Sequence, residues 1–410
     1  MTLTTPTAPS GRAEPGSRRF IATLSMCMAV TALAIDSVLP AFADIRVSLG
    51  LADDATAVTG LITAFFLGNS VGLVPAGMLA DRFGRRTVMW GGLAIYVAGA
   101  VASILAPTLI VMIVARFVWG LGAAGPRVAA LAMVRDSYEG EQMARQMSLI
   151  MAVFILVPAI APTLSSGLLV LGGFELVYGF CALAAMAVAV LVRRLPETLA
   201  SRGEGRARTR PLTDLRLVLS TPGTAGYLAA LTALFAGFLS YLASSEILFD
   251  QVYDLGEWFP LLFGGIALVL GGAMLTNGRL VERLGLSSMT TLGLSVLVGS
   301  SGLLVVAALT TGGRPPFVVF YVLLAIALFG LQLSIPNLNT AAMQPLAAVA
   351  GSGAALLGMI PGVFGALLGS LLDRSFDGTV TPISLGLLAA GLLAFVGRRR
   401  AVSAMASQHA

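Results

Sequence analysis

About twelve apolar segments, each long enough to cross a membrane, constrain this chain more than any other feature of its sequence. A helix needs roughly 20 residues to span a hydrocarbon core of about 30 Å, because each backbone polar group must find its partner inside the segment. With 57% hydrophobic and only 11% charged residues, the composition is also typical of a membrane protein. The segments are 20–40, 57–79, 88–106, 108–131, 147–170, 175–192, 224–248, 259–277, 288–310, 316–338, 349–372 and 380–397.

The longest polar stretch inside the chain, at 193–216, leaves six apolar segments on each side. It has no apolar periodicity and is interpreted as part of a linker. The sequence therefore predicts an all-α integral membrane fold with twelve transmembrane helices in two six-helix bundles. Its expected parts are a cytoplasmic N-terminal tail 1–19, a first bundle 20–192, a cytoplasmic linker 193–223, a second bundle 224–397 and a cytoplasmic C-terminal tail 398–410.

Arginine supplies all 25 basic residues of the chain, and its distribution predicts the orientation in the membrane. Twenty of these arginines lie in the tails, the linker and the connections on one side, whereas only Arg46, Arg314 and Arg374 lie on the other. Because basic residues concentrate on the cytoplasmic side, we expect a protein of the plasma (inner) membrane with both termini in the cytoplasm. This collar of arginines accounts for the net charge of +5 without a nucleic-acid partner.

Two pairs of similar stretches indicate that the halves are duplicated. "GMLADRFG" at 77–84 matches "GRLVERLG" at 278–285, an offset of 201, and "VPAIAPTLSSGLL" at 157–169 matches "IPGVFGALLGSLL" at 360–372, an offset of 203. Each match alone is weak, but two matches at nearly one offset predict two pseudo-symmetric halves. The paired positions are Gly77 with Gly278, Asp81 with Glu282, Arg82 with Arg283, Gly84 with Gly285, and Pro158 with Pro361.

The first of these stretches resembles the loop between spans 2 and 3 of the major facilitator superfamily, whose pattern is G-x-x-x-D-R-x-G-R-R. Its specified positions are filled by Gly77, Asp81, Arg82, Gly84, Arg85 and Arg86. The resemblance implies the two-bundle fold of that family and a latch between the halves on the cytoplasmic side. A carboxylate at the membrane edge can hold arginines or a helix N-terminus in one conformation and release them in another. The alternative is a tight turn whose arginines only mark topology, but the second copy, with Glu282 and Arg283, favours the latch.

Four charged residues lie within the predicted spans, where an ionised group costs at least about 2.5 kcal/mol: Asp36, Arg116, Arg127 and Glu246. Asp36 and Arg116 both fall in the outer halves of their spans. A buried aspartate whose neighbour is an arginine can bind a proton reversibly if a conformational change alters their separation. The pair therefore favours coupling to a proton gradient, and the alternative is a static buried ion pair between spans 1 and 4.

The other two intramembrane charges leave alternatives open. Arg127 follows Arg116 by three helical turns, on nearly the same face and about 16 Å deeper, so it either lines the same cavity or, as we prefer, extends to the interface. Glu246 precedes Asp250 and Asp254 at the end of its span. It either belongs to a solvated helix end or faces the cavity and attracts a cationic substrate.

Further stretches resemble the drug:proton antiporter branch of the superfamily, of the bicyclomycin and chloramphenicol resistance type. These are the D-x-x-L-P pattern that begins at Asp36, "RFVWGLGAAG" with Trp119 in place of the usual glutamine, and "LPETL" at 195–199. The resemblance implies proton coupling by Asp36 and Arg116, to which we add Glu246 as a candidate. The antiporter signature of span 5 is altered, with Ala161-Pro162 and Ser165-Ser166 in its place, although Pro158 and Pro162 still predict a bent helix.

The expected function is proton-coupled export of amphiphilic, drug-like molecules by alternating access, and the alternative is an uncoupled or importing metabolite facilitator. The candidate substrate-binding residues are Asp36, Asn69, Arg116, Phe154, Tyr241, Glu246 and Asn337. We expect no enzyme, no catalytic residue, no metal and no cofactor, because Cys27 and Cys181 lie apart within spans and the only histidine is His409. The expected partners are a small-molecule substrate, protons and the lipid bilayer, and the chain is expected to be a monomer.

Overall fold

The computed structural model describes residues 17–52, 56–199 and 211–407, and within these ranges it contains helices and no β-strand. The greater part of the N-terminal tail, residues 200–210 of the linker and the last three residues lie outside the described residues. The α-helices are α1 (Arg18–Asp36), α2 (Phe42–Ser48), α3 (Gly60–Phe83), α4 (Arg85–Ile104), α5 (Leu109–Ser137), α6 (Gly140–Val192), α7 (Pro211–Ser220), α8 (Thr224–Ile247), α9 (Phe259–Thr310), α10 (Phe317–Met343), α11 (Ala350–Asp373) and α12 (Thr381–Ala406).

Ten helical stretches among the described residues are long and apolar enough to cross a membrane, and two of them are long enough to cross it twice. Of these two, α6 has 53 residues and leaves helical geometry at Gly172 and Gly173, and α9 has 52 residues and leaves it at Gly285. The first crossing is made by α1 and α2, which are joined by a 3₁₀ turn at Leu39–Ala41. The described residues therefore provide the twelve predicted spans.

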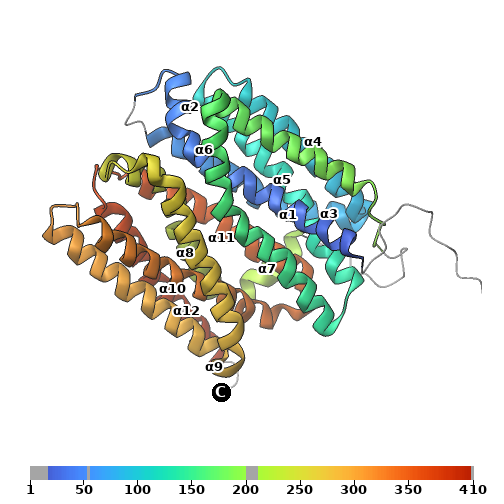
Figure 1. Cartoon of the computed structure of the whole chain (residues 1–410). Helices are drawn as coiled ribbons and strands as arrows, with labels where there is room; N and C mark the ends of the chain where they lie inside the picture. The colour runs from blue at the N-terminus through green and yellow to red at the C-terminus, as the bar shows by residue number, and fades with distance from the viewer. Residues whose placement is uncertain (1–16, 53–55, 200–210, 408–410) are drawn as a thin grey trace, which may run out of the picture.

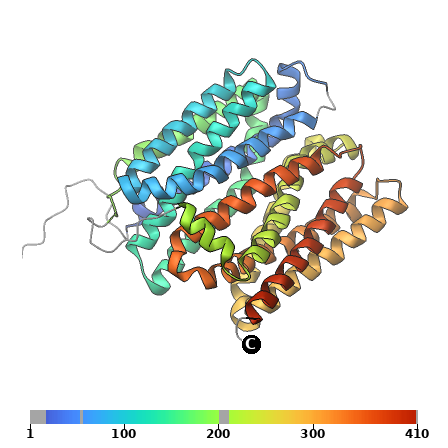
Figure 2. The same ribbon diagram turned by 180° about the vertical axis from the view of Figure 1, so that it is seen from behind.

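The spans form two bundles, which lie side by side in Figures 1 and 2. The first half contains α1 to α6, and the second half contains α8 to α12. The main contacts between them join α3 to α11 and α6 to α9. The first pair is spans 2 and 11, and the second is spans 5 and 8. Because span 2 is equivalent to span 8 and span 5 to span 11, the two contacts are related by the predicted duplication. The connection after the second span of each half contains a glycine with positive φ, Gly84 at +99° and Gly285 at +77°.

Small residues allow the helices of the first half to approach closely, as the glycines and alanines of span 4 predict. A Cβ atom on Gly120 would overlap the carbonyl oxygen of Phe65 in α3, and one on Gly68 would overlap that of Phe117 in α5. On the other side of α5, a Cβ atom on Gly122 would overlap the backbone nitrogen of Tyr96 in α4. These contacts fix α5 between α3 and α4.

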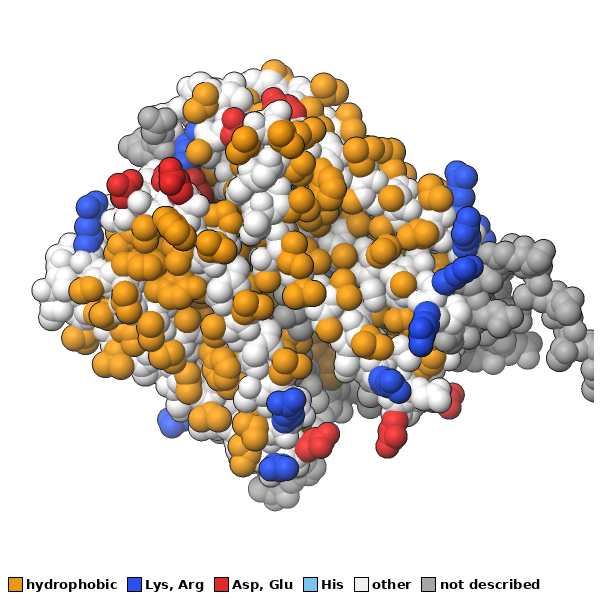
Figure 3. All heavy atoms as spheres, in the orientation of Figure 1, with side chains coloured by type: hydrophobic (Ala, Val, Ile, Leu, Met, Phe, Trp, Pro, Cys, Tyr) orange, Lys and Arg blue, Asp and Glu red, His pale blue; other side chains and the backbone are white. Residues whose placement is uncertain are grey.

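The surface has the division of polarity expected of a multi-pass membrane protein. Large apolar side chains such as Ile110, Val170 and Leu171 are exposed on the outside of the bundles. In Figure 3 a broad hydrophobic area lies between the right and lower edges, where arginines gather with a few acidic side chains, and a group of acidic side chains at the upper left. We call the former the arginine-rich end; it carries the α3–α4 connection and the C-terminal part of α12. The opposite end carries α2 and the connection between α8 and α9.

Two features differ from the sequence expectations. Part of the linker, interpreted as lacking periodicity, forms α7, because Pro211–Ser220 packs against α8 and α11. The last span does not end at residue 397, since α12 continues to Ala406. Pro158 and Pro162 both lie inside the helix of span 5, and the backbone leaves helical geometry at Gly172 and Gly173, between spans 5 and 6.

Candidate functional site

A cavity of about 470 Å³ opens between the two halves at the arginine-rich end. Its walls come from α3 and α5 of the first half and from α11 of the second, with Asp214 of α7 beside them. The volume lies within the usual range for a small-molecule site. Its charged wall residues are Asp81, Arg85, Arg127, Arg135, Asp136 and Asp214.

At the opposite end an ion pair joins the halves. Arg46 of α2 donates from Nη2 to Glu246 Oε1 of α8 at 3.0 Å, and the side chains are only 3% and 7% exposed. The other two terminal atoms, Arg46 Nη1 and Glu246 Oε2, are buried without a hydrogen-bond partner. Glu246 is thus neither a solvated helix end nor a wall residue of the cavity, because Arg46 draws it into the contact between the halves.

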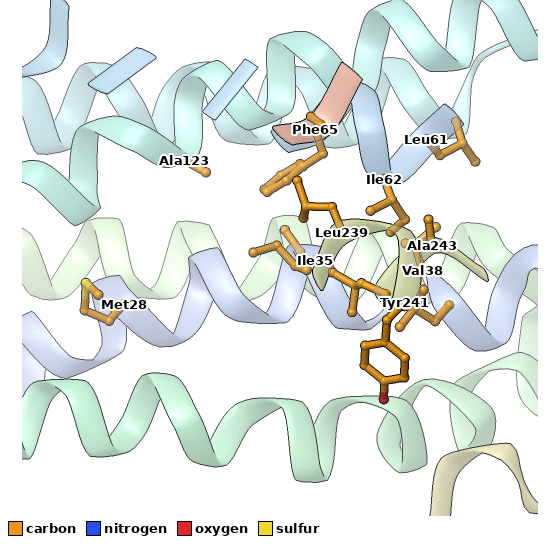
Figure 4. Close-up of a cluster of buried hydrophobic side chains, with 14 of the residues drawn as sticks. Met28, Ile35, Val38, Leu61, Ile62, Phe65, Ala123, Leu239, Tyr241 and Ala243 are labelled. Carbon is orange, nitrogen blue, oxygen red and sulfur yellow. The ribbon is translucent and has the colours of Figure 1, made fainter. Parts of the chain in front are cut away.

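Asp36 also lies where the two halves meet. It is the last residue of α1 and is 4% exposed. Figure 4 shows its neighbours Ile35 and Val38 beside Leu239 and Tyr241 of α8. Tyr241 stacks on Phe263 with ring centroids 6.1 Å apart and has no hydrogen-bond partner for its buried hydroxyl. Asp36 is therefore buried in the part of the first span that contacts α8 of the second half.

Arg116 is fully buried inside the first half. Its Nη1 donates to the carbonyl oxygen of Ala34 at 3.0 Å and its Nε to that of Leu61 at 3.4 Å. The guanidinium also lies over three aromatic rings, 4.8 Å from the centroids of Phe65 and Trp119 and 5.7 Å from that of Tyr178. Trp119, which replaces the usual glutamine, thus supplies one face of an aromatic cage.

The expected ion pair between Asp36 and Arg116 is not formed in this conformation. None of the ion pairs between described residues includes either side chain. Arg116 instead binds backbone oxygens and aromatic faces, and one of those oxygens belongs to Ala34, two residues before Asp36. Arg116 is therefore connected to Asp36 through the end of α1 rather than by direct contact.

The remaining candidates for substrate binding occupy different environments. Asn69 donates from Nδ2 to Gly120 O at 3.5 Å and accepts at Oδ1 from Arg127 Nη1 at 3.4 Å. Arg127 lines the cavity, which is the alternative we did not prefer from the sequence. Asn337 does not line the cavity. Its Nδ2 donates to Asn277 Oδ1 at 2.6 Å and joins α10 to α9. The side chain of Phe154 lies outside the described part of the structure.

The charges of the α3–α4 connection are bound within the first half. Arg85 donates from Nη1 to Asp81 Oδ1 at 2.5 Å and from Nε to Asp136 Oδ2 at 3.0 Å. Asp81 is 44% exposed and faces the cavity. The exposed guanidinium of Arg82 lies over the ring of Phe83. The expected latch between halves is thus not engaged in this conformation, because the cavity separates Asp81 from α11.

Glu197 has a role that sequence reasoning missed. Its carboxylate accepts from the backbone nitrogens of Arg85 and Arg86, at 2.8 and 3.0 Å, and so caps the N-terminus of α4. A Cβ atom on Gly84 would lie 2.6 Å from Glu197 Oε2. At Gly77, the first glycine of the motif, nothing lies within 4 Å of a Cβ placed there. Glycine is therefore required at position 84 because Glu197 caps α4 there, whereas no close packing of span 2 requires it at position 77.

The second copy of the motif repeats the backbone but not the charges. Gly285 has positive φ like Gly84, whereas Glu282 and Arg283 are exposed and belong to none of the ion pairs between described residues. At 201 positions after Glu197, Arg398 takes the equivalent place and donates to Ser287 O at 3.0 Å and Ser287 Oγ at 2.8 Å. The duplication is structural, and the charged cluster belongs to the first half.

The buried acid Asp373 was also missed, because it follows the last residue of a predicted span. Asp373 Oδ1 accepts from the hydroxyls of Ser240 and Ser244, each at 2.8 Å. These bonds tie the end of α11 to α8 within the second half. The two cysteines, Cys27 and Cys181, are free and buried in the hydrophobic core, as expected for packing residues.

The chain is similar to known transporters along most of its length. A sequence profile described as the Major Facilitator Superfamily matches residues 24–369. The bicyclomycin resistance protein homolog of Haemophilus influenzae is 24% identical over 372 residues, covering 89% of this chain and 91% of the relative. Multidrug resistance protein D of Escherichia coli is 27% identical over 371 residues, covering 89% and 90%. The crystal structure of a D-xylose-proton symporter has a TM-score of 0.73 at 13% identity and covers 92% of this chain and 98% of its own.

Proposed function

Because the chain belongs to the Major Facilitator Superfamily, we propose that this membrane transporter exports amphiphilic, drug-like molecules in exchange for protons. It is a transporter of small molecules and not an enzyme. The finer proposal draws on the relatives named for bicyclomycin and multidrug resistance, and on the position of Asp36.

The burial of Asp36 in the part of the first span that contacts the second half is the observation that carries the proposal. The structure is open at the arginine-rich end and closed at the other by Arg46 and Glu246. Alternating access requires the closed end to open, which would separate α1 from α8 and bring Asp36 into contact with water. A carboxyl group moved between a packed interface and water changes its affinity for protons. Asp36 therefore meets the physical requirement for coupling.

Arg116 provides a route by which this movement reaches the rest of the first half. Its hydrogen bond to Ala34 O holds the end of α1 against α5, and its second bond, to Leu61 O, reaches α3. A shift of α1 that exposes Asp36 would have to break the bond to Ala34 O or move α5 together with α1. We propose that Arg116 positions Asp36 and that its guanidinium is not itself the proton carrier, because arginine does not lose its proton in proteins.

The charged residues around Asp81 support a role for the α3–α4 connection in the conformation in which the cavity is closed. Across the cavity from Asp81 lie Gly351 and Ser352, in the first turn of α11, whose N-terminus favours a negative charge. Closure of the cavity would bring the carboxylate toward this helix end and engage the latch. We further propose that the arginine-rich end is cytoplasmic, in accordance with the positive-inside rule, and that one chain forms the transport unit.

An efflux screen tests the proposal. Cells that produce the intact chain or its Asp36→Asn variant are grown with chemically diverse antibacterial compounds, including bicyclomycin and chloramphenicol. The intact chain should raise the inhibitory concentration of amphiphilic compounds, and the variant should not, although both are present in the membrane in equal amounts. Equal resistance with the variant would favour an uncoupled facilitator, and no resistance to any compound would oppose export of drugs.

A further inference from the structure

The charges in the wall of the cavity are unevenly distributed along its depth. At the mouth, Asp81 and Asp136 both accept hydrogen bonds from Arg85, so these acids are already partnered. Farther in, Arg127 donates to Asn69, which precedes Asp81 by twelve residues along α3, or about 18 Å by the helical rise. The positive charge of Arg127 thus lies on the wall well inside the mouth.

Between these two levels the walls are apolar. Leu73, Val74 and Met78 line the side formed by α3, and Ala355 and Leu356 line the side formed by α11. The part of α11 that faces the cavity contributes no charged side chain. A ligand that fills this space would therefore place an apolar body against both halves and one end near Arg127.

Glu246, the acid that the sequence analysis considered for binding a cationic substrate, lies away from the cavity. Glu246 is bound to Arg46 at the opposite end of the molecule and does not line the cavity. A cation that entered the cavity would meet Arg127 at its inner end. At the mouth it would have to compete with Arg85 for Asp81 and Asp136, and of the wall acids only Asp214 stands outside the ion pairs between described residues. The charge at the inner end of the cavity thus opposes a cation and favours an anion.

We propose that the cavity binds an amphipathic organic anion, whose carboxylate or sulfonate contacts Arg127 while its apolar body lies between α3 and α11. The planar fork of a guanidinium matches the oxygens of such groups and gives charge-assisted hydrogen bonds. The inference rests on the proposed function, since it takes the cavity as the path of the exported molecule, and it adds the substrate class.

Equilibrium binding of three matched probes tests the inference. Naphthalene-2-sulfonate is the anion, 2-naphthol the neutral compound and trimethyl(2-naphthyl)ammonium the cation. Each is titrated by calorimetry into the purified full chain in detergent at pH 7. The intact chain should bind the sulfonate at least about tenfold more tightly than the other two, a difference of about 1.4 kcal/mol. Arg127→Gln should remove this preference, and Arg127→Lys should retain part of it.

Arg279→Gln is the matched control, because Arg279 is exposed and does not line the cavity. It should leave the sulfonate preference within about threefold of that of the intact chain. Equal binding of the three probes by the intact chain would overturn the inference, even if Arg127→Gln failed to fold. A preference that survives in folded Arg127→Gln, or that Arg279→Gln removes, would also overturn it. Since no proton gradient is present, the result is independent of proton coupling: drug-dependent proton movement without a sulfonate preference would reject only this inference.

Discussion

Arg46 and Glu246, 200 positions apart in the chain, form a buried ion pair of 3.0 Å that ties the first half to the second. Each residue also has one buried terminal atom without a partner, Arg46 Nη1 and Glu246 Oε2. A charge pair that is only partly satisfied holds two surfaces together with less energy than a complete network. This contact is therefore suited to open and close rather than to join the halves permanently.

Loss of either partner should favour opening of this end. Glu246→Gln leaves Arg46 as an uncompensated charge in the closed conformation, which costs about 3–5 kcal/mol. The measurement is the rate at which a maleimide labels Ser245→Cys in purified protein, with Cys27 and Cys181 replaced by serine. Labelling should accelerate with Glu246→Gln, since Ser245 is buried in the closed conformation.

The charge-exchanged double variant, Arg46→Glu with Glu246→Arg, is the control for this prediction. It should return the labelling rate toward that of the intact pair, because the ion pair is restored with its direction reversed. Unchanged labelling in Glu246→Gln would mean that other contacts keep this end closed.

Two glycines at equivalent positions should respond differently to replacement by alanine. Gly84 and Gly285 both have φ values that favour glycine, so each replacement costs about 1–3 kcal/mol of strain. Only at Gly84 would the new Cβ atom also meet the carboxylate of Glu197. We therefore expect Gly84→Ala to lose roughly a further 0.5–2 kcal/mol, the usual value of a helix cap.

Thermal unfolding of the purified variants checks this difference. Glu197→Gln serves as the third variant, because it weakens the cap without straining the backbone. If Gly285→Ala lowered the melting temperature as much as Gly84→Ala, the interaction of Glu197 with α4 would contribute little to stability.

Asp81→Ala should slow transport more than it weakens substrate binding. Asp81 faces the cavity and binds Arg85, whereas its counterpart Glu282 is exposed and outside the ion pairs of the described residues. If the substitution destabilised one of the two transport conformations by about 1.4 kcal/mol, the ratio of their populations would change roughly tenfold. Turnover and equilibrium binding are measured for Asp81→Ala and for Glu282→Ala, which should resemble the intact chain. Unchanged turnover in Asp81→Ala would reduce the motif to a marker of topology.

The spans and the duplication could be predicted because they depend on local patterns. The length of an apolar segment is fixed by the membrane, and the glycines at 84 and 285 are fixed by the backbone turn that follows the second span of each half. The helical part of the linker was missed because its ten residues, Pro211–Ser220, are too few to form a stable helix alone and take their stability from contacts with other helices.

The partners of the charges could not be predicted from one sequence. Glu246 pairs with Arg46 and Glu197 caps α4 at Arg85, contacts between residues 200 and 112 positions apart. Such pairings depend on how helices pack, which composition does not specify. The intramembrane position of Arg116 was predictable, but its partners are carbonyl oxygens and aromatic rings rather than the nearby acid. A charge pattern thus identified unusual positions without identifying what they contact.

Substrate-dependent proton movement in proteoliposomes tests the central claim most directly. Vesicles containing a pH-sensitive dye are prepared with the intact chain, with Asp36→Asn or with Asp373→Asn. The last is the matched control, since Asp373 is a buried acid whose hydrogen bonds to Ser240 and Ser244 an asparagine can keep. Addition of a compound to which the chain confers resistance should move protons in the intact chain and in Asp373→Asn, and should move none in Asp36→Asn. Proton movement of equal size in folded Asp36→Asn would contradict the account.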